Sequence, residues 1–250
     1  GLPGVDEVIA FDKRGKESGL AGLRAKAADL KARGFDLALS AHRSARSGGL
    51  LALAGIPRRI GYANADIPWF YTDRVPRLPE LHEVHRVLAL MGPIGGIPEG
   101  FCPKPFLPAV EPAGEDLIGS APRPRVGICP GSVWPTKRYS ATGFAAAARE
   151  LTDRCGASVY LIGSREDRET ADEVMAAAGP GLTDLVGKTN LRDWVRVIAA
   201  MDLVITNDSG PTHVASALGV PVAVIYGPTT PAQGFTPFGV PSRVLEVEMP

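Results

Sequence analysis

The fold is decided by the stretch RVGICPGSVWPTKRYSATGFAAAARELTDRCGASVYLIG, residues 125–163. Residues 125–130 are an apolar run of strand length that ends in proline and is followed by glycine. Residues 140–154 repeat apolar side chains at helical spacing, and residues 157–163 form a second apolar run. Two strand-like runs joined by a helix predict a β-α-β unit, in which the strands lie parallel in one sheet.

The same alternation continues towards the C-terminus. Further apolar runs of strand length lie at residues 184–187, 203–207 and 222–227. Helical patterns cover residues 167–178, 191–201 and 211–218. Repeated units of this kind predict an α/β fold with a doubly wound parallel sheet. Ligands bind such sheets at the carboxyl ends of the strands, where helix N-termini present unpaired amides.

The first half of the chain is predicted to form another α/β domain. Residues 5–11 and 35–40 are strand-like, and residues 20–33 have helical spacing between them. Eight prolines fall between residues 93 and 124, and proline disrupts helices and strands alike. We therefore predict one domain over residues 1–108, a linker over 109–124 and a second domain over 125–250.

Composition excludes several classes of protein. Lys plus Arg and Asp plus Glu both number 27, so no global positive field is available to bind nucleic acid. No apolar run approaches the length of about 18 residues that a membrane-spanning helix needs. The three cysteines have spacings unlike a zinc or redox motif, and the four histidines are scattered, so we expect no metal site. A reducing, cytoplasmic location is the simplest expectation.

Two loops are candidate anion sites. Ser132, Lys137 and Arg138 follow the strand at 125–130, in a turn whose small residues leave backbone amides open. The turn is not a Walker motif, because Thr136 stands where that motif requires glycine. An ordinary strand-to-helix loop with solvated basic side chains is the alternative.

The second candidate follows the strand at 203–207. Ser209 or Gly210 is expected to begin a helix, with outward-facing amides. Asp208 could simply cap that helix, and His213 could simply pack. A catalytic pair of Ser209 and His213 is disfavoured, because the serine lacks the flanking glycines of a nucleophile elbow.

Two further polar loops are expected at the same edge of the sheet. Glu166 and Asp167 could bind a sugar or ribose hydroxyl, although complementing a helix dipole explains them equally well. Lys188 and Thr189 stand just before another helix. Four polar loops with two anion sites point to a ligand that carries two phosphates, such as a nucleoside diphosphate.

Arginines and aromatic residues gather in the first half. Arg43, Arg46 and Arg59 lie in a segment that is rich in arginine and contains Trp69, Phe70 and Tyr71. Such a face suits a phosphorylated or carboxylated acceptor with sugar rings. Scattered, solvated arginines are the alternative.

Taken together, four motifs resemble the lipopolysaccharide heptosyltransferase family. They are Pro130-Gly131-Ser132 with Lys137, and residues 187–191, 207–213 and 226–229. The resemblance covers most of the second half and extends more loosely to residues 55–62. It implies the GT-B architecture, two Rossmann-like domains that face a cleft. The implied reaction is inverting transfer of heptose from ADP-heptose to the inner core of lipid A-linked oligosaccharide, with no metal or other cofactor.

The resemblance also assigns roles to residues. Lys137 would neutralise the leaving diphosphate, Ser132 would contact phosphate, and Glu166 or Asp167 would hold the ribose. The other implied donor contacts are Lys188, Thr189, Asp208, Ser209, Gly210 and His213. Arg43, Arg46 and Arg59 would contact the acceptor, whose lipid anchor implies peripheral contact with the cytoplasmic face of the inner membrane.

One departure concerns the general base. Family members open with a strand and a Gly-Asp loop whose Asp is the presumed base, and this chain has no such opening. We therefore expect a first domain that lacks its opening β-α unit, a chain that stops before its returning helix, and a fragment that does not turn over by itself. The alternatives are another nucleotide-sugar transferase or epimerase of the same architecture, and a non-catalytic nucleotide-sugar-binding protein.

Overall fold

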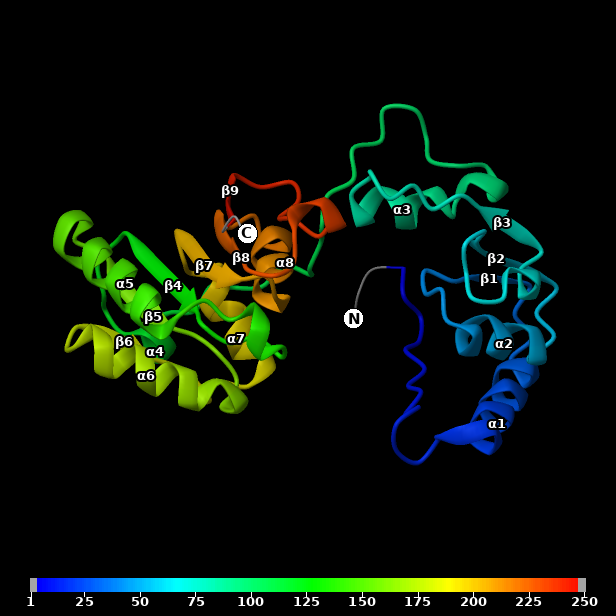
Figure 1. Cartoon of the computed structure of the whole chain (residues 1–250), viewed down its shortest axis with the longest axis horizontal. Helices are drawn as coiled ribbons and strands as arrows, with labels where there is room; N and C mark the ends of the chain where they lie inside the picture. The colour runs from blue at the N-terminus through cyan, green and yellow to red at the C-terminus, as the bar shows by residue number, and fades with distance from the viewer. Residues whose placement is uncertain (1–3, 247–250) are drawn as a thin grey trace. The chain divides into compact units, whose positions relative to one another are not determined.

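The computed structural model describes residues 4–246, which form two compact units (Figure 1). One unit is Gly4–Cys102 and the other comprises residues 103–246. The second unit therefore begins before the predicted linker at 109–124. A short helix within that linker, α4 (Glu115–Ile118), packs against α7 (Leu191–Ala199) of the same unit.

The second unit contains a six-stranded, all-parallel sheet. Its strands lie in the order β6 (Leu182–Asp184), β5 (Ser158–Leu161), β4 (Arg125–Cys129), β7 (Leu203–Asn207), β8 (Val222–Tyr226) and β9 (Ser242–Glu246). The chain winds outwards from β4 in one direction and then from β7 in the other. The point between β4 and β7 is therefore a topological switch point, where open α/β sheets bind their ligands.

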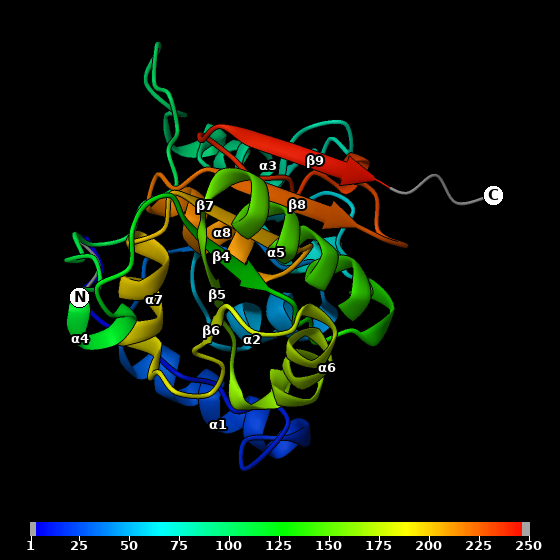
Figure 2. The ribbon, with the colours of Figure 1, turned by 90° about the vertical axis from the view of Figure 1, so that its left-hand side faces the viewer.

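Helices cover both faces of this sheet (Figure 2). On one face α5 (Ala141–Cys155) and α6 (Arg168–Ala178) bury Phe144 and Val174 against the strands. On the other face α7 and α8 (Gly210–Ala217) bury Val197 and Ala215. Because the central strands are covered on both sides, they are continuous apolar runs without polar alternation. These runs are the pattern from which the strands were predicted.

The helix starts follow from local capping. Ser140 accepts a hydrogen bond from the Gly143 N–H at the start of α5, and Asn190 accepts one from the Asp193 N–H at the start of α7. Each such cap contributes about 1 kcal/mol. Helix α5 ends at Cys155 and is capped by Gly156, whose φ of 62° is a left-handed conformation that favours glycine.

The first unit has a three-stranded parallel sheet in the order β1 (Leu37–Leu39), β2 (Arg58–Tyr62) and β3 (Asp73–Val75). Its helices are α1 (Gly19–Ala32), α2 (Ala45–Leu53) and α3 (Glu83–Ala89). Across the described chain, single 3₁₀ turns lie at η1 (Pro68–Phe70), η2 (Gly92–Ile94), η3 (Pro135–Lys137), η4 (Arg165–Asp167) and η5 (Pro231–Gln233). Gly61 is required in β2, because a Cβ there would lie 2.5 Å from the Tyr71 ring.

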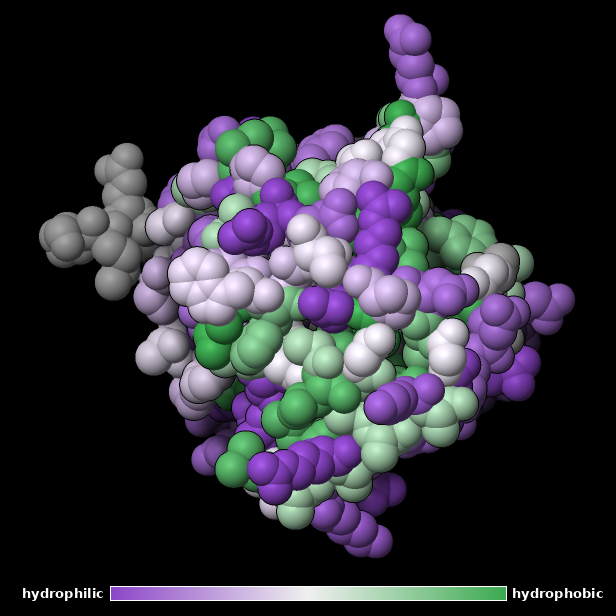
Figure 3. Space-filling view, turned by 90° about the vertical axis from the view of Figure 1, so that its right-hand side faces the viewer, coloured by the Kyte–Doolittle hydropathy of each residue, from purple (hydrophilic) through white to green (hydrophobic). Residues whose placement is uncertain are grey.

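The buried clusters of the first unit are small, and large apolar side chains remain at its surface. Leu20, Leu53 and Trp69 are 72%, 54% and 76% exposed. Figure 3 shows a face of the molecule on which apolar side chains lie among hydrophilic ones. Within residues 4–246, no helix has the length and apolar character needed to cross a membrane.

Several predicted elements differ in the structure. Residues 5–11 are not a strand, because no described strand lies beside them, and Val8 is 84% exposed. The strand predicted at 184–187 lies earlier, at β6, where its pairing with β5 defines it. The short strands β3 and β9 were not predicted, since edge position and half-exposure weaken their apolar pattern.

Candidate functional site

A cavity of about 720 Å³ lies at the carboxyl edge of the second sheet. Its lining comes from the segments that follow β4, β5, β6 and β7. These are four polar loops that the sequence places at one edge, and they meet at the switch point between β4 and β7. The volume is within the usual range for small-molecule sites.

The loop after β4 is tied to the loop after β7 through Asn207. This side chain is fully buried, and its Nδ2 donates to the carbonyl oxygen of Pro130 at 2.8 Å. Its Oδ1 accepts from the Tyr139 N–H at 2.8 Å. Ser132, which lines the cavity, is 7% exposed. The position of Ser132 is therefore set by hydrogen bonds that cross between adjacent strands.

Lys137 and Asp208 are brought together, but as partners of each other. The Nζ of Lys137 lies 2.5 Å from Oδ2 of Asp208, and the Thr229 hydroxyl donates to the same oxygen at 3.0 Å. Both side chains are largely buried, with 22% and 10% exposed. Neither residue lines the cavity. Burial and the neighbouring Asp208 carboxylate raise the pKa of Tyr226, so this phenol stays neutral at physiological pH.

Asp167 shapes the loop after β5. Its Oδ2 accepts from both the N–H and the hydroxyl of Ser164 at 2.8 Å, which forms a capping box for η4. The carboxylate packs over Gly131, where a Cβ would lie 1.9 Å from Oδ1. Hydrogen bonds from its own N–H and from the Ser164 hydroxyl lower the pKa of Glu166. Both predicted carboxylates line the cavity. The lowered pKa favours the ionised form of Glu166.

The loop after β6 separates its two predicted residues. Lys188 donates to the Asp184 carbonyl oxygen at 2.8 Å and pairs with the Asp184 carboxylate at 3.0 Å, so it is held at the end of β6 outside the cavity lining. Thr189 lines the cavity, and its buried hydroxyl has no hydrogen-bond partner among the described residues. A buried polar group without a partner costs about 1–3 kcal/mol, which a ligand would offset by hydrogen bonding.

The N-terminus of α8 opens onto the cavity. Ser209 and Gly210 line it, and unlike Ser140 and Asn190 at α5 and α7, Ser209 makes no side-chain cap. A Cβ at Gly210 would meet nothing within 4 Å, so the space beside the Cα of this residue is open. His213 is exposed and does not line the cavity.

The apolar walls of the cavity were not predicted from the sequence. Ile162, Leu191 and Trp194 line it, as does the buried Cys129. Burial, with a further contribution from Asp167, raises the pKa of the Cys129 thiol, so it is neutral. Trp194 belongs to the first turn of α7, at the ligand-binding edge of the sheet, and that position is the signal that would have identified it.

The three predicted acceptor arginines are not brought together. Arg43 lines a separate cavity of about 300 Å³ at the carboxyl edge of the first sheet, with Arg77 and Glu83. Arg46 donates to the Lys13 carbonyl oxygen at 3.2 Å.

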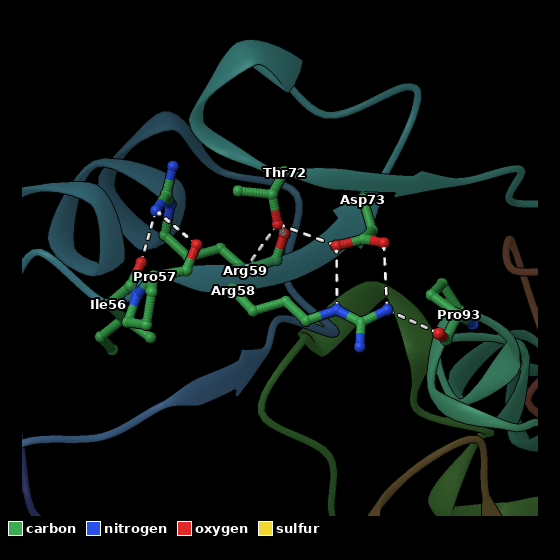
Figure 4. Close-up of polar contacts among 7 residues, drawn as sticks. All are labelled: Ile56, Pro57, Arg58, Arg59, Thr72, Asp73 and Pro93. Atoms are coloured by element: carbon green, nitrogen blue, oxygen red, sulfur yellow. Dashed lines mark hydrogen bonds and ion pairs between the residues drawn. The ribbon is translucent and has the colours of Figure 1, made fainter.

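Arg59 lies near the amino end of β2 and is engaged with the backbone (Figure 4). Its guanidinium donates to the Phe70 carbonyl oxygen at 2.7 Å and to that of Ile56. Its neighbour Arg58 pairs with Asp73. These contacts give Arg59 a structural role in joining the strand ends.

Known proteins similar to this chain include heptosyltransferases. Residues 23–246 match glycosyltransferase family 9 (heptosyltransferase). The chain belongs to this family. Over 123 residues it is 41% identical to lipopolysaccharide heptosyltransferase 2 of Escherichia coli K12, a match that covers 47% of this chain and 34% of the relative. Over 144 residues it is 38% identical to lipooligosaccharide heptosyltransferase 2 of Haemophilus influenzae, covering 51% and 40%.

These matches span well under half of the length of the two curated relatives. Among solved structures, that of E. coli ADP-heptose LPS heptosyltransferase II aligns with a TM-score of 0.69 at 29% identity, covering 91% of this chain and 73% of that one. A family 9 glycosyltransferase from Veillonella parvula aligns with a TM-score of 0.80 at 24% identity, covering 99% and 74%. The α/β fold class predicted from the sequence is confirmed by these family 9 structures.

The titratable side chains give no metal centre in the described part of the chain. No three His, Cys, Asp or Glu residues between 4 and 246 are grouped as ligands.

Proposed function

We propose that this chain provides the nucleotide-sugar site of an inverting heptosyltransferase, which transfers heptose from ADP-heptose to the inner core of lipopolysaccharide. Membership of family 9 supports the reaction class. The cavity at the switch point supports the donor site, and this single observation carries the proposal. Its apolar walls suit a base, while its hydroxyls, carboxylates and open helix N-terminus suit a ribose and a diphosphate.

Transfer of the sugar develops negative charge on the departing diphosphate. We assign the stabilisation of this charge to the Lys137 ammonium, which is preorganised by Asp208, to whose carboxylate Thr229 also donates. A preset cation stabilises charge without reorganising when the bond breaks, and it supplies what a metal ion would otherwise supply. The carboxylates of Glu166 and Asp167 are already bound to Ser164, so we assign neither as the general base.

The acceptor and its location are part of the same proposal. Arg43, at the cavity of the first unit, is the basic residue that best suits an acidic sugar acceptor. A lipid-linked acceptor would bring the protein to the cytoplasmic face of the inner membrane. No observation favours an epimerase or a non-catalytic binding protein over the transferase.

Donor choice is tested by calorimetric titration of the chain with ADP, UDP and GDP, followed by ADP-heptose. We expect ADP to bind more tightly than UDP or GDP, and ADP-heptose to compete with ADP for one site. Substitution of Trp194 by alanine should lower the affinity for ADP without altering the affinity for pyrophosphate. Equal affinity for the three nucleotides would remove the ADP-heptose assignment, and no binding of any of them would remove the nucleotide-sugar assignment.

A further inference from the structure

The charges inside the cavity do not match the ligand that the site is proposed to bind. Its charged lining residues are Arg138, Glu166 and Asp167, so the described lining carries one cation and two carboxylates. A diphosphate that enters this cavity needs a positive partner within it. Lys137 is held by Asp208 outside the lining, which leaves Arg138 as the cation that the ligand meets.

Arg138 is held in place by one of its own nitrogens. Its Nε donates to the carbonyl oxygen of Ser132 at 2.9 Å, and the side chain is half-buried. No carboxylate in the described chain forms an ion pair with it, so the two terminal nitrogens keep their donors for a ligand. A guanidinium whose orientation is already set loses little entropy on binding and matches phosphate oxygens in pairs.

The open N-terminus of α8 lies in the same cavity as Arg138. The β4 and β7 strands are neighbours, with Cys129 opposite Thr206, so the loops that follow them emerge side by side. Arg138 comes from the first of these loops and Gly210 from the second, and both line the cavity. A side-chain cation and an uncapped helix N-terminus therefore meet in one space, which is an arrangement that favours phosphate.

We propose that Arg138 is the residue that binds the diphosphate of the nucleotide in this cavity, together with the Gly210 amide. This inference rests on the proposed function, and it gives the two cations, Arg138 and Lys137, different roles. Arg138 contributes to nucleotide affinity before the reaction. Lys137, in its pair with Asp208, contributes to the charge that develops during transfer. A cation that acts equally on bound substrate and transition state changes binding, whereas one that acts only on the transition state changes turnover.

The test is calorimetry of the whole chain with ADP, adenosine and inorganic pyrophosphate. The variants are Arg138→Met, which keeps the length of the stem but removes the charge, and Arg138→Lys, which keeps the charge. Arg154→Met is the matched control, because it removes the same charge from α5, where Arg154 is 78% exposed and forms an ion pair with the exposed Glu150. Urea midpoints of all variants establish that each one is folded.

We expect Arg138→Met to weaken ADP and pyrophosphate by roughly 10- to 100-fold and to leave adenosine within twofold. The affinity of Arg138→Lys for ADP and pyrophosphate should lie between those of Arg138→Met and the wild type. Arg154→Met should bind both ligands as the wild type does. Unchanged ADP affinity in Arg138→Met overturns the proposal, as does an equal loss for adenosine and ADP, since that would mean that Arg138 only supports the cavity wall.

The two proposals fail in different ways. If the wild-type chain binds pyrophosphate but not ADP, the nucleotide assignment fails, and the pyrophosphate series still decides the role of Arg138. If it binds ADP but Arg138→Met is unaffected, the nucleotide site stands and the Arg138 assignment falls. Absence of binding to both ligands refutes both.

Discussion

Replacement of Gly131 by alanine should distort the cavity through one identifiable contact. The added methyl would lie 1.9 Å from Oδ1 of Asp167, so the carboxylate must rotate away. Asp167 would then lose its two 2.8 Å hydrogen bonds to Ser164, which cap η4. A lost cap and a second lost hydrogen bond cost about 1 kcal/mol each. Alanine also reduces the conformational entropy of the unfolded chain, which stabilises the protein by about 0.5 kcal/mol. The free energy of unfolding should therefore fall by about 1–2 kcal/mol.

Urea unfolding of the second unit measures this loss. The chain has three tryptophans, and Trp69 is 76% exposed, so a Trp69→Phe background leaves Trp134 and Trp194 to report the second unit. Gly210→Ala is the matched control from the same cavity. A Cβ there would meet nothing within 4 Å, so we expect its stability to stay within about 0.5 kcal/mol of the parent.

A double-mutant cycle with Asp167→Ala isolates the contact. Without the carboxylate, the alanine at position 131 has no clash to relieve, so Gly131→Ala should become neutral or slightly stabilising in that background. We expect a coupling free energy of about 1–2 kcal/mol between the two sites. A coupling below about 0.5 kcal/mol would show that the Asp167 contact is not the reason why glycine is required there.

Three further outcomes follow from the same contacts. Lys137→Met should destabilise the chain by about 1–3 kcal/mol in urea, because Asp208 stays buried without its cation, whereas Lys137→Met with Asp208→Asn should recover most of this loss. Thr189→Val should leave unfolding unchanged or raise its free energy by about 1 kcal/mol, and it should weaken ADP in calorimetry; tighter ADP binding would contradict a role for this hydroxyl. Burial would raise the pKa of Asp184, but Lys188 and the neighbouring hydrogen bonds outweigh it and lower this pKa. The resulting stability is present above the ordinary Asp pKa and is lost as pH falls through the lowered value, so Asp184→Asn should flatten the acid limb of a stability–pH profile.

Much of the second unit is determined by sequence pattern alone. Apolar runs such as the one ending at Cys129 predict parallel strands, because strands covered on both faces need no polar alternation. Parallel strands also place the loops that follow them at one edge, so Ser132, Thr189 and Gly210 could be assigned to one site from their order in the chain. The alternation of β and α elements thus determines the fold class and the edge at which a ligand binds.

Only the tertiary structure decides which side chains face the ligand. Lys137 and Arg138 are adjacent in the sequence, yet one is turned into a pair with Asp208 and the other lines the cavity. Arg59 was predicted to contact the acceptor, but its guanidinium is bound to backbone carbonyl groups. Residues 5–11 were predicted as a strand, but they are not part of either described sheet. The reason is that periodicity describes contacts within one element, whereas side-chain direction and strand pairing depend on partners supplied by distant parts of the chain.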